Sequence, residues 1–286
     1  MKTCLECLPC LTNNAITIAR KCSGDPVVQQ RIVTESMKML GSSDLHYPAP
    51  YYASKIAEIA LTLSGDLEAD PYLAEKEKST RLAKQLLGEL NSIPEYDPSS
   101  FESRLRLAIA GNILDFGVYA DLDLKDAVDT IRKAFTRPID REAMRKLEAK
   151  IREASRILYI LDNCGEAVFD RVFMELFAEK VTIAVRGKNS LNDMTRKELA
   201  VSGFDASVPV VDNGSRIPGS MLEFAGEPFR EAMKSADLII AKGQGNFETM
   251  DEIPYPASFL FLAKCPVVTQ RIGAEMRSIQ IRNVNF

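Results

Sequence analysis

The side chains best suited to chemistry follow short apolar runs in the second half of the chain. Asp162 and Asn163 come directly after the apolar run 157–161. An acid followed by an amide offers one charged and one neutral oxygen ligand, which suits Mg²⁺ or Mn²⁺. The same two residue types are also common in turns and at helix starts. The pair therefore indicates either a cation site or a structural turn.

A second carboxylate, Asp193, follows the next apolar run, 181–185. It either caps a helix expected at 194–202 or converges with Asp162 on one metal. Strand ends separated by a single crossover helix are often neighbours in a parallel sheet, so this pairing is geometrically reasonable.

A third polar group follows the apolar run 237–241, in the segment KGQGNFE. Lys242 offers a point charge suited to phosphate, and Gly243 and Gly245 let the backbone approach a ligand closely. The segment is neither a Rossmann fingerprint nor a P-loop, and a GxG pattern alone is also typical of a tight turn.

Two further polar residues interrupt an apolar helix expected at 100–118. Asn112 and Asp115 lie three residues apart and so share one face of that helix. Polar groups in such a helix need partners. They either bond to the other part of the molecule or line a cleft.

The cysteines form a separate pattern. Cys4, Cys7 and Cys10 recur every three residues, which resembles half of a zinc or iron–sulfur site. A complete site needs a further thiolate, from Cys22, Cys164, Cys265 or another molecule. Cysteine is also a small apolar core residue, so a structural role is the alternative.

Composition limits the kinds of metal ligand, partner and cellular location that this chain can have. The chain of 286 residues has one histidine, His46, which excludes a metal site with several imidazoles and leaves oxygen and sulfur donors. The net charge of −4 and the lack of a basic tract disfavour nucleic acid as a partner. No secretory signal or long apolar span is present, so we expect a cytoplasmic protein without a membrane partner.

The secondary structure expected for the chain changes near residue 155, from helices alone to strands that alternate with helices. The first part shows helical periodicity, in segments that include 26–40, 51–64, 71–91, 124–135 and 139–155. Five apolar runs then alternate with helical segments, at 157–161, 181–185, 208–211, 237–241 and 259–262, with helices expected at 165–178, 194–202 and 220–235. This alternation predicts a mostly parallel sheet covered on both faces, with ligands at the carboxyl ends of its strands. We therefore expect a helical N-terminal domain, residues 1–150, followed by a three-layer α/β/α domain, residues 151–286.

In combination, these features resemble the DUF89 family of damage-control phosphatases, in its stand-alone archaeal and bacterial branch with an N-terminal CxxC. The residues that carry the resemblance run in the family's order from residue 4 to residue 266: Cys4-x-x-Cys7, Asp70-Pro71-Tyr72, AGNILDFG from Ala110 to Gly117, Leu161-Asp162-Asn163, Asn192-Asp193-Met194-Thr195, KGQGNFE from Lys242 to Glu248, and Lys264-Cys265-Pro266.

The resemblance implies that a divalent metal (Mn, Ni, Co or Mg) supports hydrolysis of a small phosphorylated metabolite. It implies that Asp162, Asn163 and Asp193 hold the metal and that Lys242 neutralises phosphate. By the same resemblance, Asn112 and Asp115 belong to the substrate contacts. Gly243, Gly245 and Asn246 complete the expected substrate-binding set, because their backbone amides could hold phosphate oxygens.

Two routes of hydrolysis are open. An aspartyl-phosphate route would favour Asp-x-Asp after the first strand, whereas this chain has Asp162-Asn163-Cys164. That absence favours direct attack by a metal-activated water, with Asp162 as metal ligand and orienting group.

Two other function classes compete with a phosphatase. One is a metal or redox sensor built on the N-terminal thiols, with an α/β domain that binds a ligand without chemistry. The other is a carboxylate methyltransferase, which the lack of a glycine-rich loop after the first strand disfavours.

Overall fold

The computed structural model describes residues 1–114 and 124–286. The expected substrate residue Asp115 therefore lies outside the described residues.

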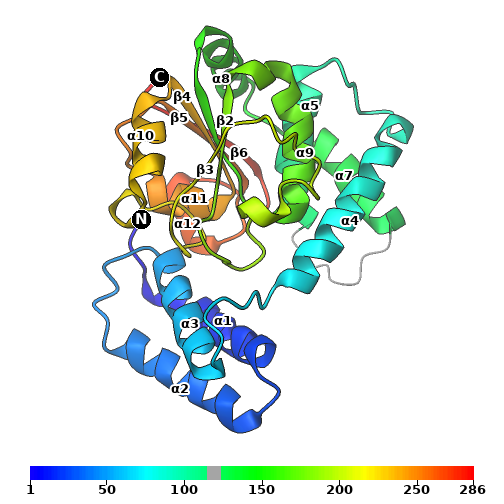
Figure 1. Cartoon of the computed structure of the whole chain (residues 1–286). Coiled ribbons are helices and arrows are strands. Elements are labelled where there is room, and N and C mark those ends of the chain that lie inside the picture. Colours follow the sequence, from blue (N-terminus) through cyan, green and yellow to red (C-terminus); the bar gives the residue numbers. More distant parts are fainter. Residues whose placement is uncertain (115–123) are drawn as a thin grey trace.

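Three helices at the N-terminus form a unit with its own apolar core (Figure 1), which we call the helical lobe: α1 (Leu8–Cys22), α2 (Pro26–Gly41) and α3 (Ala49–Ser64). Asp25 caps α2 by accepting a hydrogen bond from the backbone N–H of Val27, and Pro26 occupies the first helical position. Gly65 ends α3 in the left-handed conformation, with φ of +85°.

The helices that follow belong to the other part of the molecule. They are α4 (Leu73–Glu89), α5 (Phe101–Ala110), α7 (Leu124–Thr136) and α8 (Arg141–Glu153). Their buried faces pack on α9 (Cys164–Met174) or on the sheet rather than on the helical lobe. The helices before residue 150 are therefore divided between two cores, and the domain boundary at that residue stays a prediction.

A six-stranded sheet forms the centre of the molecule (Figure 1). Its strands are β1 (Ile157–Ile160), β2 (Val181–Val185), β3 (Val210–Asp212), β4 (Leu238–Lys242), β5 (Ala257–Leu262) and β6 (Ile279–Val284), in the order β3-β2-β1-β4-β5-β6. The first five are parallel, and β6 runs antiparallel to β5 at one edge. Strands buried on both faces explain the continuous apolar runs of the sequence.

Alternate residues of each strand face opposite helical layers. Ile157, Tyr159 and Ile240 pack toward α5, α8 and α9. Leu158 and Ile239 pack toward α10 (Glu227–Ser235), α11 (Gln244–Met250) and α12 (Pro266–Ile272). The expected three-layer α/β architecture with a mostly parallel sheet, preceded by helices, is confirmed.

Three expectations about single elements were wrong. The segment 194–202 holds only a 3₁₀ turn, Arg196–Glu198, which a capping box between Thr195 and Glu198 stabilises. The segment 220–235 contains a 3₁₀ turn, Leu222–Phe224, and helix α10 begins only at Glu227. The helix expected at 100–118 is α-helical only to Ala110, and a 3₁₀ turn, Gly111–Leu114, follows it.

Three further 3₁₀ segments lie in the described ranges: Leu5–Cys7, Leu90–Ser92 and Glu175–Lys180. Among the helices of the described ranges, none has the length and apolar character that crossing a membrane requires.

Candidate functional site

A cavity of about 290 Å³ lies where the helical lobe meets the carboxyl ends of β1, β2 and β4. Its walls come from both parts of the molecule and comprise Cys10, Leu11, Asn14, Ala49, Pro50, Ala53, Asn112, Asp162, Asn163, Leu191, Asn192, Asp193, Pro218, Gln244, Gly245, Glu248 and Lys264. Ligands of open α/β sheets bind at this edge, in the crevice where the strand order reverses, which here falls between β1 and β4. The cavity thus lies where the sheet topology favours a binding site.

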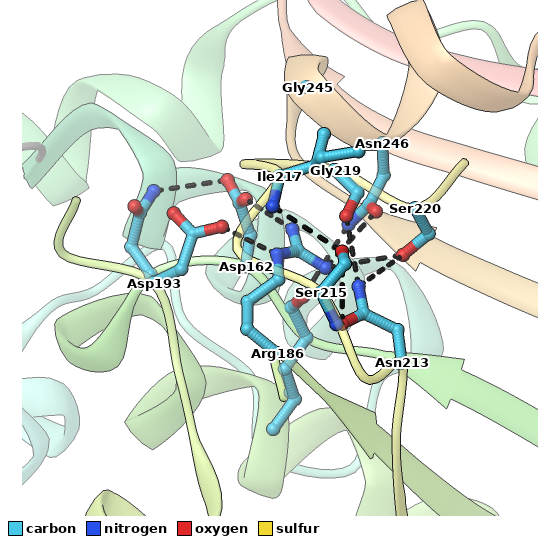
Figure 2. Close-up of polar contacts among 12 residues, drawn as sticks. Asp162, Arg186, Asp193, Asn213, Ser215, Ile217, Gly219, Ser220, Gly245 and Asn246 are labelled. Carbon is cyan, nitrogen blue, oxygen red and sulfur yellow. Dashed lines mark hydrogen bonds and ion pairs between the residues drawn. The ribbon is translucent and has the colours of Figure 1, made fainter. Parts of the chain in front are cut away.

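The two carboxylates expected to bind metal meet at this cavity and share one arginine (Figure 2). Asp162 follows β1 and Asp193 lies in the loop after β2, and a backbone bridge joins Asn163 to Asp193. The fully buried Arg186 reaches Asp193 Oδ2 through Nε at 2.6 Å and Asp162 Oδ1 through Nη2 at 3.4 Å. Arg186 therefore offsets part of the negative charge that this pair concentrates.

Burial dominates the electrostatics of Asp162. It raises the pKa of this carboxyl well above the ordinary value, and the nearby charges of Asp193 and Glu166 raise it further. Arg186 and Lys264 oppose that shift. A carboxylate in such a place is stabilised by any additional cation that binds beside it.

Glu166 fixes the orientation of the two amides next to Asp162. Its Oε2 accepts hydrogen bonds from Asn112 Nδ2 at 2.7 Å and from Asn163 Nδ2 at 3.4 Å. Both amides also direct Nδ2 toward Asp162 Oδ2, at 3.4 Å and 3.1 Å. Asn112 Oδ1 is left buried without a hydrogen-bond partner among the described residues.

These donors fit a hard divalent cation. Two carboxylates, Asp162 and Asp193, stand beside amide oxygens, one of which is an unpartnered buried acceptor. Oxygen donors of this kind suit Mg²⁺ or Mn²⁺. Within the described part of the chain, no three His, Cys, Asp or Glu side chains gather as a metal-binding group, so amide oxygens would have to complete the ligand set.

Lys242 does not line the cavity. Its side chain is 0% exposed, and its Nζ donates to Glu166 Oε1 at 2.5 Å, to Asp170 Oδ1 at 2.6 Å and to the Ala108 carbonyl at 2.8 Å. We call Glu166, Asp170 and Lys242 the buried ion cluster. The two carboxylates of this cluster and the Ala108 carbonyl accept from all three hydrogen atoms of the ammonium group, so this geometry does not support the expected contact between Lys242 and phosphate.

Lys264 is the lysine of the cavity wall. It follows β5 by two residues, and its charge lowers the pKa of Asp162 against the larger effect of burial. Its backbone N–H donates to Gln244 Oε1 at 2.9 Å, which ties the loop after β5 to the start of α11.

Besides Lys242 and Gln244, the KGQGNFE segment contributes two glycines and the amide of Asn246 to the site. Gly243 has φ of +79°, and a Cβ there would collide with the Asp162 carboxylate. Gly245 lines the cavity, and a Cβ there would collide with the Pro218 carbonyl. Asn246 is buried behind the wall, where its Oδ1 accepts from Arg186 Nη1 at 3.3 Å and its Nδ2 donates to the Lys242 carbonyl at 2.7 Å (Figure 2). Asn246 thus positions Arg186.

Comparison with known proteins identifies the family. The model of the damage-control phosphatase ARMT1-like domain matches residues 3–279. The chain belongs to this family. It is 32% identical to a damage-control phosphatase of Pyrococcus horikoshii, over 95% of this chain and 94% of that protein. It is 28% identical to a damage-control phosphatase of Archaeoglobus fulgidus, over 96% and 97% of the two chains.

A solved structure extends the likeness to three dimensions. The crystal structure of a DUF89 family protein from Pyrococcus horikoshii superposes with a TM-score of 0.88 at 31% identity, and covers 99% of this chain and 100% of that one. The resemblance that the sequence motifs indicated is confirmed for the damage-control phosphatase family over nearly the whole chain.

The four cysteines expected to form a soft-metal or redox site are three near the N-terminus and Cys265. Cys4 Sγ and Cys7 Sγ lie 3.6 Å apart, and burial raises the pKa of Cys7 to about 12. Cys265, which precedes α12, lies close enough to Cys7 for its charge to raise that pKa as well, whereas Cys10 lines the cavity. All four are free cysteines, and a metal-binding or redox role for them stays a prediction.

Sequence reasoning missed several residues that this damage-control phosphatase-like site uses. Arg186, Glu166 and Lys264 were given no role, although each follows the carboxyl end of a strand by a few residues. That position was a usable signal. Gln244 carried the same signal, two residues after β4, whereas Asn14 had none, because its place in the wall depends on how α1 packs.

Proposed function

We propose that this chain is a divalent-metal-dependent hydrolase of small phosphomonoesters. Membership of the damage-control phosphatase family and the names of two relatives support phosphatase activity. The observation that carries the metal-dependent part is the pair of carboxylates, Asp162 and Asp193, beside the unpartnered oxygen of Asn112 in one cavity.

Five residues of the cavity wall have distinct parts in this proposal. Asp162, Asn163 and Asp193 would hold the metal, and Asn112 Oδ1 is a fourth candidate oxygen. A bound divalent cation would offset the charge of the phosphate dianion and lower the pKa of a water molecule. Lys264 neutralises the phosphate oxygens from the loop after β5, at the same edge of the sheet, and Asp162 orients the attacking water and receives its proton.

Direct attack by water remains preferable to an aspartyl-phosphate route. Both oxygens of Asp162 already accept hydrogen bonds, from the amides of Asn112 and Asn163 and from Arg186, and these contacts reduce the nucleophilicity of the carboxylate. The second position after it is Cys164, which is buried and donates to the Asp193 carbonyl. The second carboxylate that an aspartyl-phosphate route would favour is therefore absent from that position.

The test is phosphate release from p-nitrophenyl phosphate with Mn²⁺, Co²⁺, Ni²⁺ or Mg²⁺. We expect Asp162→Asn and Asp193→Asn to lower kcat by about 100-fold or more, because each removes a charged metal ligand. Asp129→Asn, at an exposed position on α7, is the matched control and should keep wild-type activity. Full activity of both site variants would refute the assignment.

The thiol pair supports a second candidate function. Sulfur atoms 3.6 Å apart suit a shared soft metal or a redox reaction. A metal or redox sensor predicts zinc or iron that is lost in the double variant Cys4→Ser/Cys7→Ser, together with an absence of phosphatase activity under every metal. Phosphate release by the double variant at the wild-type rate would separate the thiols from catalysis.

A further inference from the structure

The helical lobe supplies one side of the cavity, and nearly all of that side is small or apolar. Leu11 from α1 and Ala49, Pro50 and Ala53 from α3 give it shape but no strong hydrogen-bonding group. Asn14, one turn after Cys10 on α1, is the exception among the described wall residues of this lobe. Its polar side chain therefore needs a separate explanation.

The side-chain oxygen of Asn14 is a hydrogen-bond acceptor that has no donor. Its Oδ1 is closed off from solvent and has no hydrogen-bond partner among the described residues. A buried polar atom without a partner costs about 1–3 kcal/mol, and such atoms in native proteins call for a specific reason. Asn13, its neighbour in the chain, is exposed and shows that the same residue type on this helix can face water at no such cost.

On the opposite wall, Gln244 has protein partners for both ends of its amide. Its Nε2 donates to Glu248 Oε1 at 2.7 Å, and its Oε1 accepts from the Lys264 backbone N–H at 2.9 Å. These bonds tie Glu248 and the loop after β5 to the start of α11. Asn14 differs from it because its amide oxygen is unused on the protein side.

We propose that Asn14 is a specificity-determining residue, whose amide hydrogen-bonds a hydroxyl group on the alcohol part of the phosphate ester. This inference rests on the proposed function, in which the wall of Asp162, Asp193 and Lys264 takes the phosphate end. The wall from the helical lobe is then left to the alcohol part. A substrate hydroxyl that pairs with this amide binds more tightly than a hydrogen atom in its place, because the amide oxygen otherwise stays unpaired.

The test compares two six-carbon esters that differ only in hydroxyl groups, glucitol 6-phosphate and n-hexyl phosphate. For each, kcat/KM is measured with Mn²⁺ for the wild type, Asn14→Ala and the matched control Asn13→Ala. Alanine is a strong helix former, so Asn14→Ala keeps α1 intact. Thermal unfolding of the variants verifies this.

We expect Asn14→Ala to lower kcat/KM for glucitol 6-phosphate by roughly 5- to 10-fold, the usual loss for one hydrogen bond, and to leave n-hexyl phosphate unchanged. Asn13→Ala should match the wild type on both esters. An equal loss on both esters, or no loss on either, would overturn the proposal.

A binding measurement separates this inference from the proposed function. Calorimetric titration of both esters into the protein without added metal needs no turnover. If the wild type hydrolyses neither ester, the proposed function fails. The inference about Asn14 then stands if Asn14→Ala loses the preference for glucitol 6-phosphate in binding, and it falls if the preference is kept or was never present.

Discussion

Lys242 Nζ lies 2.5 Å from Glu166 Oε1, and both side chains are 0% exposed. Glu166 in turn accepts hydrogen bonds from the amides of Asn112 and Asn163. The buried ion cluster therefore supports the cavity from behind, through the residues that orient its oxygen donors. Lys242 and Lys264 both belong to motifs that the sequence shares with the family. Lys242 lies in the buried ion cluster, whereas Lys264 lines the cavity.

Replacing Lys242 should damage stability first. Lys242→Met leaves Glu166 and Asp170 buried without their cation, and breaking a buried ion pair costs about 3–5 kcal/mol. We expect a decrease of that size in the free energy of unfolding, measured by denaturant titration. Lys84→Met, at an exposed position of α4, is the control and should change stability by no more than ~0.5 kcal/mol. A fully stable Lys242→Met would contradict the cluster.

Replacing Lys264 should damage phosphate binding instead. Its side chain lines the cavity and is partly exposed, so Lys264→Met should unfold at nearly the wild-type temperature. Loss of one charge-assisted hydrogen bond should lower kcat/KM for p-nitrophenyl phosphate by roughly 10- to 100-fold. Steady-state kinetics measure this, and an unaltered kcat/KM would remove Lys264 from the proposed site.

Glu166→Gln tests the orientation of the amides. A glutamine cannot accept from Asn112, Asn163 and Lys242 together as the carboxylate does, so one amide loses its fixed direction. Groups that orient metal ligands typically contribute about 10- to 100-fold in metal affinity. We expect such a loss in Mn²⁺ affinity, read from the electron paramagnetic resonance of free Mn²⁺. Glu153→Gln, exposed on α8, should bind Mn²⁺ as the wild type does.

Asp170 should make stability depend on pH. Burial raises its pKa from the ordinary value to about 7, against the opposing charge of Lys242. Between its ordinary pKa near 4 and about 7, the folded protein holds more protons at this site than the unfolded chain. The contribution of Asp170 to stability is therefore greatest at low pH and decreases as pH rises through that window.

Asp170→Asn removes this dependence because asparagine does not titrate. Denaturant titrations at several pH values from 4.5 to 8 should show the wild type losing stability relative to Asp170→Asn as pH increases. Parallel curves for the two proteins, with a constant difference at every pH, would show that the residue does not titrate in this window.

Gly243 should tolerate no side chain. A Cβ at this position would collide with the Asp162 carboxylate, and φ of +79° is strained for other residues. We expect Gly243→Ala to lower the free energy of unfolding by about 1–3 kcal/mol and to reduce activity by displacing Asp162. Gly88→Ala on α4 meets no atom within 4 Å and should stabilise the protein by about 0.5–1 kcal/mol. Equal behaviour of the two variants would contradict this contact.

The sequence by itself determined the architecture and the edge at which the site lies. Continuous apolar runs alternating with helices require a parallel sheet covered on both faces, and β1, β2 and β4 formed close to the expected residues. Polar residues directly after those runs must then meet at one edge. Asp162 and Asn163 could be selected on that ground, since they follow β1 closely. Asp193 lies farther along the loop after β2 and is joined to the site by the backbone bridge with Asn163.

Only the tertiary structure decided which lysine faces the cavity and what the helical lobe contributes. Lys242 is the last residue of β4 and shares the face of Leu238 and Ile240, which α5 and α9 cover, so its ammonium group is directed into the core. The strand period of two gives that face, but the helices that cover it and the carboxylates they carry depend on packing between distant segments. Asn14 reaches the same cavity from 148 residues before Asp162 in the chain, a contact that no local pattern encodes.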